Sequence, residues 1–181
     1  SDGDFSRSKL IRRYNDDLGN DLGNLLNRVV SMIGRYRNGV VPAAGDAQDL
    51  ETELREVAET AREKAAHHID QWELNEALEN IWTLVRRANQ YLEGRKPWML
   101  AKDEANAGLL DTTLYTAAEA TRLAGLFLAP FIPGTSNRIM AQLGLPDVAV
   151  GDWQTSGTWG AATFTEVKPA GPLFPRIEVE S

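Results

Sequence analysis

The stretch LNEALENIWTLVRRANQYLEGRKPW, from Leu74 to Trp98, decides the fold class. Its apolar residues recur at intervals of three and four, which is the spacing of one face of an α-helix. These residues are Leu74, Ala77, Leu78, Ile81, Val85 and Ala88. The pattern predicts a helix over residues 73–92 with one buried stripe. Pro97 disfavours a helical conformation at Lys96, so we expect the chain to turn sharply where Trp98 begins.

The same periodicity extends over most of the chain and predicts four more helices. Their expected ranges are 8–36, 46–68 with Asp46 as N-cap, 103–129, and a short helix that begins at Thr135 or Ser136 and ends at Gly144. Short connections between amphipathic helices are typical of an all-α fold, an antiparallel helical bundle of about five helices. Residues 145–181 are rich in Gly, Pro, Thr and aromatics, which predicts an irregular C-terminal tail.

The tryptophans differ in their expected roles. Trp72 and Trp82 lie on expected bundle helices and are predicted to be core residues, whereas Trp153 and Trp159 have no assigned role. Trp98 follows the cations Arg95 and Lys96 and a proline-induced turn, which allows two interpretations. It is either the last side chain of the core or a platform for a binding partner.

The bulk composition is that of an ordinary globular protein. The chain has 181 residues, of which 43% are hydrophobic and 25% charged, enough for one domain with its own core. No apolar run reaches the roughly 18 residues of a membrane span. The absence of cysteine excludes a disulfide framework or a thiolate metal site and favours a cytoplasmic origin. The net charge of −7 argues against indiscriminate binding to nucleic acid, but not against a local basic patch.

The sequence shows no pattern for catalysis. Glu63 and His67 are one helical turn apart, which could make two metal ligands. Di-metal sites in helical bundles, however, repeat a Glu-x-x-His pattern on two helices. Three residues before His67 and His68, where this pattern needs glutamate, the sequence has Lys64 and Ala65. His67 and His68 are therefore interpreted as solvated side chains near a helix C-terminus. A glycine-rich phosphate loop and a Gly-x-Ser-x-Gly motif are both absent. We expect no catalytic residue, metal site or cofactor in this chain.

The first expected helix carries a second, polar stripe opposite its apolar one. The apolar stripe comprises Leu18, Leu22, Leu25, Val29 and Ile33. The polar stripe comprises Asn20, Asn24, Asn27, Arg28, Ser31 and Arg35. Asparagine is a mediocre helix former, so three of them in one helix invite an explanation. The stripe is either an ordinary solvent-facing surface or a ridge of donors and acceptors suited to base edges and phosphates.

Three segments together resemble one known family. The opening helix of the anticodon-binding domain of methionyl-tRNA synthetases resembles residues 13–33, RYNDDLGNDLGNLLNRVVSMI. The Asn-x-Tyr helix end and Pro-Trp corner of that domain resemble residues 75–102, NEALENIWTLVRRANQYLEGRKPWMLAK. Its return segment resembles residues 172–178, PLFPRIE. The likeness covers nearly the whole chain. The lengths of 38–46 and 151–163 do not match the family pattern, and the catalytic domain with its HIGH-type and KMSKS-type signatures is absent.

The resemblance implies a function for the polar stripe and for Trp98. In that family the bundle reads the CAU anticodon, so Trp98 is expected to stack on an anticodon base, the first-position cytosine. Asn24 and Arg28 are expected to hydrogen-bond anticodon bases, and Arg35 is a further candidate on the same stripe. Asn89 either contacts RNA or braces the corner at Pro97. Cations expected to share one basic face are Arg12, Arg13, Arg28, Arg35, Arg37, Arg86, Arg87, Arg95 and Lys96.

The resemblance also implies the domain organisation and the partners. Residues 1–7 would be a junction from the missing catalytic domain, 8–144 the anticodon-binding bundle, and 145–181 a tail returning toward that domain. The partners would be initiator and elongator methionine tRNAs and the parent's own catalytic domain, with no membrane and no DNA. ATP with Mg is implied for the catalytic domain alone. The alternatives are a helical protein–protein interaction module, the same domain of the isoleucine, valine, leucine or cysteine synthetases, and a metal-dependent bundle enzyme.

Overall fold

The structure is a computed structural model, and it describes residues 9, 12, 16, 20–148 and 153–170. The helices are α2 (Gly23–Arg37), α3 (Asp49–Asp70), α4 (Leu74–Arg95), α5 (Pro97–Leu100), the 3₁₀ helix η2 (Glu104–Asn106), α6 (Ala107–Phe127) and α7 (Pro133–Gln142). Within these ranges the only β-type pairing is an isolated antiparallel bridge between Val40 and Glu166. The predicted all-α fold is confirmed.

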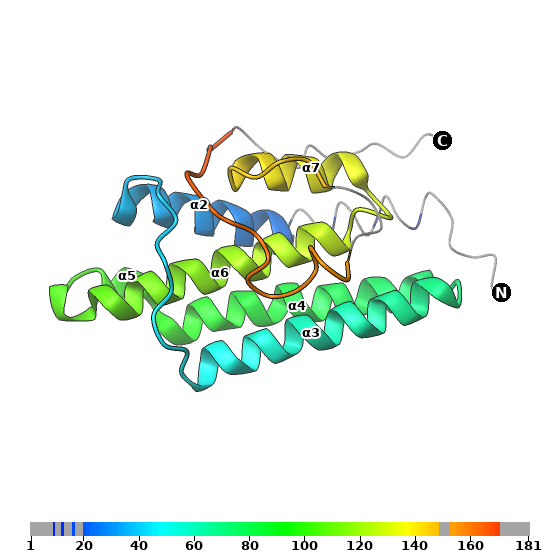
Figure 1. Cartoon of the computed structure of the whole chain (residues 1–181), viewed down its shortest axis with the longest axis horizontal. Helices are drawn as coiled ribbons and strands as arrows, with labels where there is room; N and C mark the ends of the chain where they lie inside the picture. The colour runs from blue at the N-terminus through cyan, green and yellow to red at the C-terminus, as the bar shows by residue number, and fades with distance from the viewer. Residues whose placement is uncertain (1–8, 10–11, 13–15, 17–19, 149–152, 171–181) are drawn as a thin grey trace.

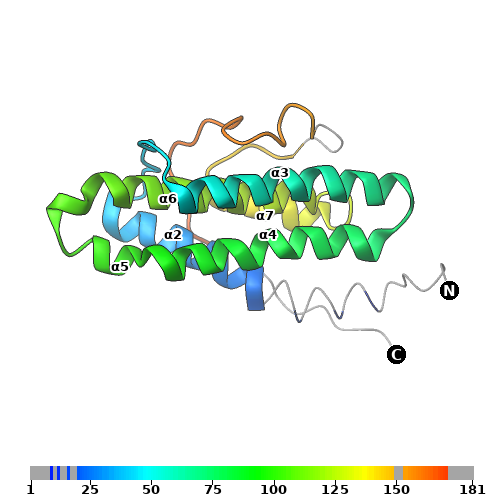
Figure 2. The ribbon, with the colours of Figure 1, turned by 90° about the horizontal axis from the view of Figure 1, so that it is seen from below.

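Helix α6 is the centre of the bundle. The hairpin of α3 and α4 packs on one side of it, while α2 and α7 pack on the other (Figures 1 and 2). Nearly every residue of α6 from Leu110 to Phe127 is buried, because the helix has neighbours on most of its circumference. At Gly125, an added Cβ would lie 2.9 Å from a side-chain atom of Ile139, so α6 and α7 approach each other too closely for a larger residue. None of the helices described is both long enough and apolar enough to cross a membrane.

The predicted apolar stripe of the first helix is confirmed over the residues described. Leu22, Leu25, Val29 and Ile33 are all fully buried, and Leu18 lies outside the described residues. The described residues of the predicted helix over 8–36 are helical up to Arg37, but residues 20–22 form a π-helical turn just before α2, so the 3.6-residue register shifts there.

Helix α3 begins later than the sequence analysis predicts. Its N-cap is Gln48 and not Asp46, and the backbone N–H of Gln48 donates to Glu51 Oε1 over 2.9 Å. The reason is the spacing of the capping box, which needs a Glu or Gln three residues after the N-cap. Helix α7 likewise begins at Pro133, which suits the first helical position, and not at Thr135 or Ser136, which are buried within it.

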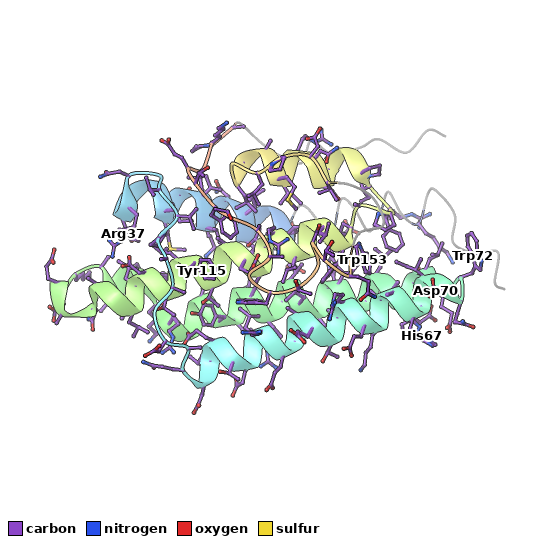
Figure 3. All side chains as sticks on the ribbon, viewed as in Figure 1. Arg37, His67, Asp70, Trp72, Tyr115 and Trp153 are labelled. Atoms are coloured by element: carbon purple, nitrogen blue, oxygen red, sulfur yellow. The ribbon has the colours of Figure 1, made fainter. Side chains whose placement is uncertain are left out.

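Of the two tryptophans predicted to lie in the core, only Trp82 does. It is 1% exposed, whereas Trp72 is 83% exposed. Helix α3 ends at Asp70, so Trp72 falls in the turn between α3 and α4, where its φ of 59° places it in the left-handed region. Figure 3 shows the indole at the tip of the hairpin, pointing away from the bundle.

The described parts of the C-terminal segment, residues 145–148 and 153–170, are irregular, as predicted, but residues 153–170 follow a path fixed by side chains of α6. Arg122 donates to the carbonyls of Ser156 at 2.7 Å and Thr158 at 3.1 Å, and the backbone N–H of Gly160 donates to Glu119. Arg122 also donates to Glu119, and the two side chains are 5% and 0% exposed. Trp153 is buried against Phe127, with ring centroids 4.9 Å apart. The segment 172–178 lies outside the described residues.

Candidate nucleic-acid interface

The chain turns sharply after α4, as the proline predicts. Lys96 has a φ of 51°, in the left-handed region, and its backbone N–H donates to Leu92 O, which ends α4. Pro97 then opens the four-residue helix α5, whose N–H groups at Met99 and Leu100 both donate to Lys96 O. Pro97 is buried, Trp98 is half-buried and Met99 is 50% exposed. The corner therefore presents part of the Trp98 indole to solvent.

Arg28 of α2 lies against this corner. Its guanidinium carbon is 5.7 Å from the centroid of the Trp98 ring, within the range of a cation–π contact. Nη2 of Arg28 donates to Glu93 over 2.7 Å, and Nη1 donates to Asn89 Oδ1 over 3.4 Å. The Arg28 side chain is 30% exposed. Two residues assigned to the same function from the sequence thus meet in space, although one lies on α2 and the other follows α4.

Asn89 holds α2 and α4 together. Besides accepting from Arg28, it donates to the carbonyl of Asp21 at 3.1 Å and to that of Val85 at 3.4 Å. Of the two roles left open by the sequence, the structure shows bracing, but the element braced is the start of α2 and not Pro97. Direct contact of Asn89 with RNA stays a prediction.

The polar stripe of α2 faces solvent. Asn24, Asn27, Ser31 and Arg35 are exposed, and Asn24 is one turn from Arg28. Arg35 is seven residues beyond Arg28, or about 10 Å along the axis of α2. The structure therefore brings Arg28, Asn89 and Trp98 together, with Asn24 exposed one turn before Arg28 and Arg35 exposed two turns after it.

The expected basic face is largely neutralised by acidic neighbours. The ion pairs are Arg28–Glu93 at 2.7 Å, Arg37–Asp111 at 2.5 Å, Arg86–Glu79 at 3.6 Å, Arg87–Glu53 at 3.7 Å and Arg95–Glu51 at 2.7 Å. The sequence analysis missed these partners because most of them lie on other helices. Long-range attraction for phosphates is consequently weak at this surface, and close contacts must supply the affinity.

A buried carboxylate lies just behind the corner, and sequence reasoning missed it as well. Glu51 of α3 is 3% exposed and accepts hydrogen bonds from Tyr91 Oη at 2.6 Å, Arg95 Nε at 2.8 Å and Arg95 Nη2 at 2.7 Å. Burial alone would raise the pKa of Glu51, but the bonds from Arg95, Tyr91 and the Gln48 N–H outweigh it and lower the pKa from 4.5 to about 2. Burial and the neighbouring Glu51 raise the pKa of Tyr91. The available signal was the Gln48–Glu51 capping-box spacing.

The histidines form no metal centre. Within the ranges that the structure describes, no three His, Cys, Asp or Glu side chains are grouped to hold a metal ion. His67 and His68 stack edge to face with ring centroids 5.5 Å apart, and His68 Nδ1 lies 3.4 Å from Glu73. Figure 3 shows His67 near the tip of the α3–α4 hairpin, close to Trp72. This end of the hairpin carries no recognisable chemistry.

Residues 41–178 match the family model described as the anticodon binding domain of methionyl tRNA ligase. This range contains Trp98 but begins after α2, so Asn24 and Arg28 lie outside it. Similarity to full-length proteins covers α2 as well. The chain is 41% identical to the methionine–tRNA ligase of Caldanaerobacter subterraneus subsp. tengcongensis over 99% of its residues, and 40% identical to that of Clostridium tetani over 100%. It spans 28% of the length of each of these relatives.

Solved structures of methionyl-tRNA synthetases are also similar to this chain. The free form of the Mycobacterium tuberculosis methionyl-tRNA synthetase superposes with a TM-score of 0.82 at 32% identity, covering 97% of this chain and 36% of that one. The form of that enzyme bound by methionyl-adenylate superposes with a TM-score of 0.79 at 31% identity, covering 94% of this chain and 34% of the other.

Proposed function

This chain belongs to the family of anticodon-binding domains of methionyl-tRNA ligases, and we propose that its Asn24–Arg28–Trp98 surface reads the CAU anticodon of initiator and elongator methionine tRNAs. The observation that carries the proposal is the convergence of Arg28 and Trp98, which places a guanidinium beside a half-exposed indole. Bases splayed out of a single-stranded loop are recognised by stacking on aromatic rings and by hydrogen bonds to their edges. The cluster offers both kinds of contact.

Each residue has a distinct part in this proposal. Trp98 stacks on the first-position cytosine, and Arg28 donates hydrogen bonds from its guanidinium to base edges. Asn24, exposed one turn before Arg28, supplies an amide that both donates and accepts. Asn89 keeps α2 in register with α4, and Arg35 at the end of the stripe contacts a phosphate.

The chemistry of the parent enzyme belongs to another part of the protein. We infer that the parent ligase forms methionyl-adenylate from methionine and ATP with Mg in a catalytic domain outside this chain, and then esterifies the tRNA terminus. This chain contains no phosphate-binding loop and is not expected to catalyse either step. Its partners in this scheme are methionine tRNA and the catalytic domain, with the cytoplasm as the place of action.

The interaction-module alternative has less support. It requires a contiguous apolar patch on the outer surface. Among the residues described, the exposed large hydrophobic side chains are Val40, Trp72 and Met99. Trp72 lies at the opposite end of α4 from Met99, so these side chains do not form one patch.

The test is a binding titration with two labelled RNA stem-loops, one with the CAU anticodon and one with UAU. The isolated chain should bind the CAU loop at least about tenfold more tightly, since a good bidentate hydrogen-bond contact to a base edge discriminates against the wrong base by about 1–3 kcal/mol. Equal affinity for the two loops would overturn the proposed reading of the first anticodon base. If the CAU loop binds the Arg28→Ala variant as tightly as it binds the wild-type chain, the proposed role of Arg28 is wrong.

A further inference from the structure

Trp98 lies on a short and partly exposed element. Helix α5 has only four residues, the indole is half-buried, and Met99 beside it is 50% exposed. Lys96, just before this helix, has a φ of 51°, a left-handed conformation that is strained for a residue other than glycine. Helix ends fray when nothing beyond the backbone holds them. The direction of the indole therefore depends on what fixes the last turn of α4.

One carboxylate holds the end of that turn, in addition to the buried Leu92 and the Arg28–Glu93 pair. Arg95, the last residue of α4, donates from Nε and Nη2 to the two oxygens of Glu51, at 2.8 and 2.7 Å. A two-bond guanidinium–carboxylate pair sets orientation as well as distance. The side chains of Arg95 and Glu51 are 13% and 4% exposed, so water competes little for these bonds.

Glu51 is also held in place by groups other than Arg95. It lies in the first turn of α3 and accepts from the N–H of Gln48, while Tyr91, one turn before Arg95, donates to Oε2 over 2.6 Å. The carboxylate thus joins the start of α3 to the end of α4. Trp98 follows Arg95 by three residues, so any loosening of the Arg95–Glu51 pair passes directly to the indole.

We propose that Glu51, through Arg95, is a positioning residue for anticodon readout that sets the orientation of Trp98 without touching the RNA. This inference rests on the proposed function, because it assigns Glu51 a part in the stacking that Trp98 performs. The loss of the Glu51–Arg95 pair then reduces affinity through Trp98 and through no other contact. A purely structural Glu51 would instead lower stability and leave the affinity of the folded fraction unchanged.

The experiment is a double-mutant cycle read by stem-loop titration. Glu51→Gln keeps the size of the side chain and removes its charge. It should lower affinity for the CAU loop at least about fivefold and reduce the preference for CAU over UAU. In a Trp98→Ala background the same change should alter CAU affinity less than about twofold, because the side chain that it positions is gone.

Arg95→Lys, which keeps the charge but loses the two-bond geometry, should reproduce this pattern and decides the matter if Glu51→Gln does not fold. Glu119→Gln is the matched control. It makes the same substitution in the other buried Glu–Arg pair, Glu119 with Arg122 on α6, so it should lower the melting temperature and keep both the affinity and the CAU preference. If Glu51→Gln and Arg95→Lys act equally with and without Trp98, or not at all, the inference is wrong. A wild-type chain that does not distinguish CAU from UAU would overturn the proposed function itself, which is a different result.

Discussion

The guanidinium of Arg28 lies over the ring of Trp98, with its carbon 5.7 Å from the ring centroid. Glu93 also pairs with Arg28 at 2.7 Å, so two contacts hold the guanidinium in the free domain. Fixing a binding group in advance reduces the conformational entropy lost on association. The free domain therefore already holds a stacking surface and a donor next to each other.

Replacing Trp98 by alanine should weaken CAU stem-loop binding about tenfold or more, because one stacked base is lost. Stability should fall by less than the about 3–5 kcal/mol typical of a buried aromatic, since the indole is half-buried. Trp98→Phe should recover part of the affinity. Titration and thermal melting of the same preparations give both quantities.

Trp72→Ala is the control, because Trp72 is 83% exposed at the opposite end of α4. A Trp98→Ala variant that melts far lower yet binds normally would make Trp98 a core residue.

Replacing Arg28 by alanine should lower stem-loop affinity by about 1–3 kcal/mol, the range for a good base contact from a guanidinium. Lys102→Ala should have much less effect, because Lys102 is exposed beyond the corner. Titrations at two salt concentrations separate base readout from general charge attraction, because the general charge attraction weakens as the salt concentration rises. Equal losses for the two variants would show that charge, not readout, dominates.

The acid stability of the domain should depend on Glu51. Its pKa is about 2 in the folded chain, below the ordinary 4.5, so its stabilising effect is complete above about pH 4.5 and is lost as the pH falls toward 2. The lowered pKa of Glu51 contributes on the order of 3 kcal/mol to the free energy of unfolding at neutral pH. Urea unfolding of wild type and Glu51→Gln at about pH 6 and about pH 3 should show a gap that narrows at the lower pH. A gap independent of pH would mean that the carboxylate is not the responsible group.

The buried pair of Glu119 and Arg122 should be a major determinant of stability. Glu119→Gln leaves a buried guanidinium without its counter-charge, which typically costs about 3–5 kcal/mol. The control is Arg86→Ala, whose partner Glu79 is 3.6 Å away in an exposed pair and contributes about 0–1 kcal/mol. Chemical denaturation of both variants tests the contrast. Similar losses for the two would contradict it.

Purified chain should not exchange pyrophosphate into ATP in the presence of methionine, because its sequence offers no loop to hold the phosphates. The assay needs material free of host synthetase. Exchange above that background would show that the chain contains catalytic residues that the sequence analysis missed.

The helices were predictable from the sequence, whereas their boundaries were not. Burial of one stripe is a property of residues three and four apart, so the periodicity of α4 was enough to place it. The start of α3 at Gln48 depends on Glu51, which is held by Arg95 on another helix. The exposure of Trp72 depends on the turn between α3 and α4, where its left-handed backbone conformation directs the indole away from the core, and helical periodicity does not predict such a conformation.

The candidate site was predictable in part for the same reason. The resemblance named Asn24, Arg28 and Trp98 from short local motifs, and in the structure Asn24 is exposed while Arg28 and Trp98 are half-buried. Their contact with an anticodon stays a prediction. The acids that pair with the arginines, such as Asp111 with Arg37, come from other helices, and sequence spacing carries no information about them. Figure 3 shows Arg37 at the end of α2, near the linker to α3.

Helix α4 has Trp72 just before one end and Trp98 just after the other. Its 22 residues make a rod about 33 Å long. A lever of this length converts a tilt of about 5° at the Trp72 end into a displacement of about 3 Å at Trp98, close to the roughly 3.4 Å spacing between successive bases of one strand. For the readout proposed for Trp98, distinguishing one nucleotide from the next would therefore require the bundle to be oriented to within a few degrees. The orientation of α4 would then matter to the accuracy of that readout as much as the side chains at the corner.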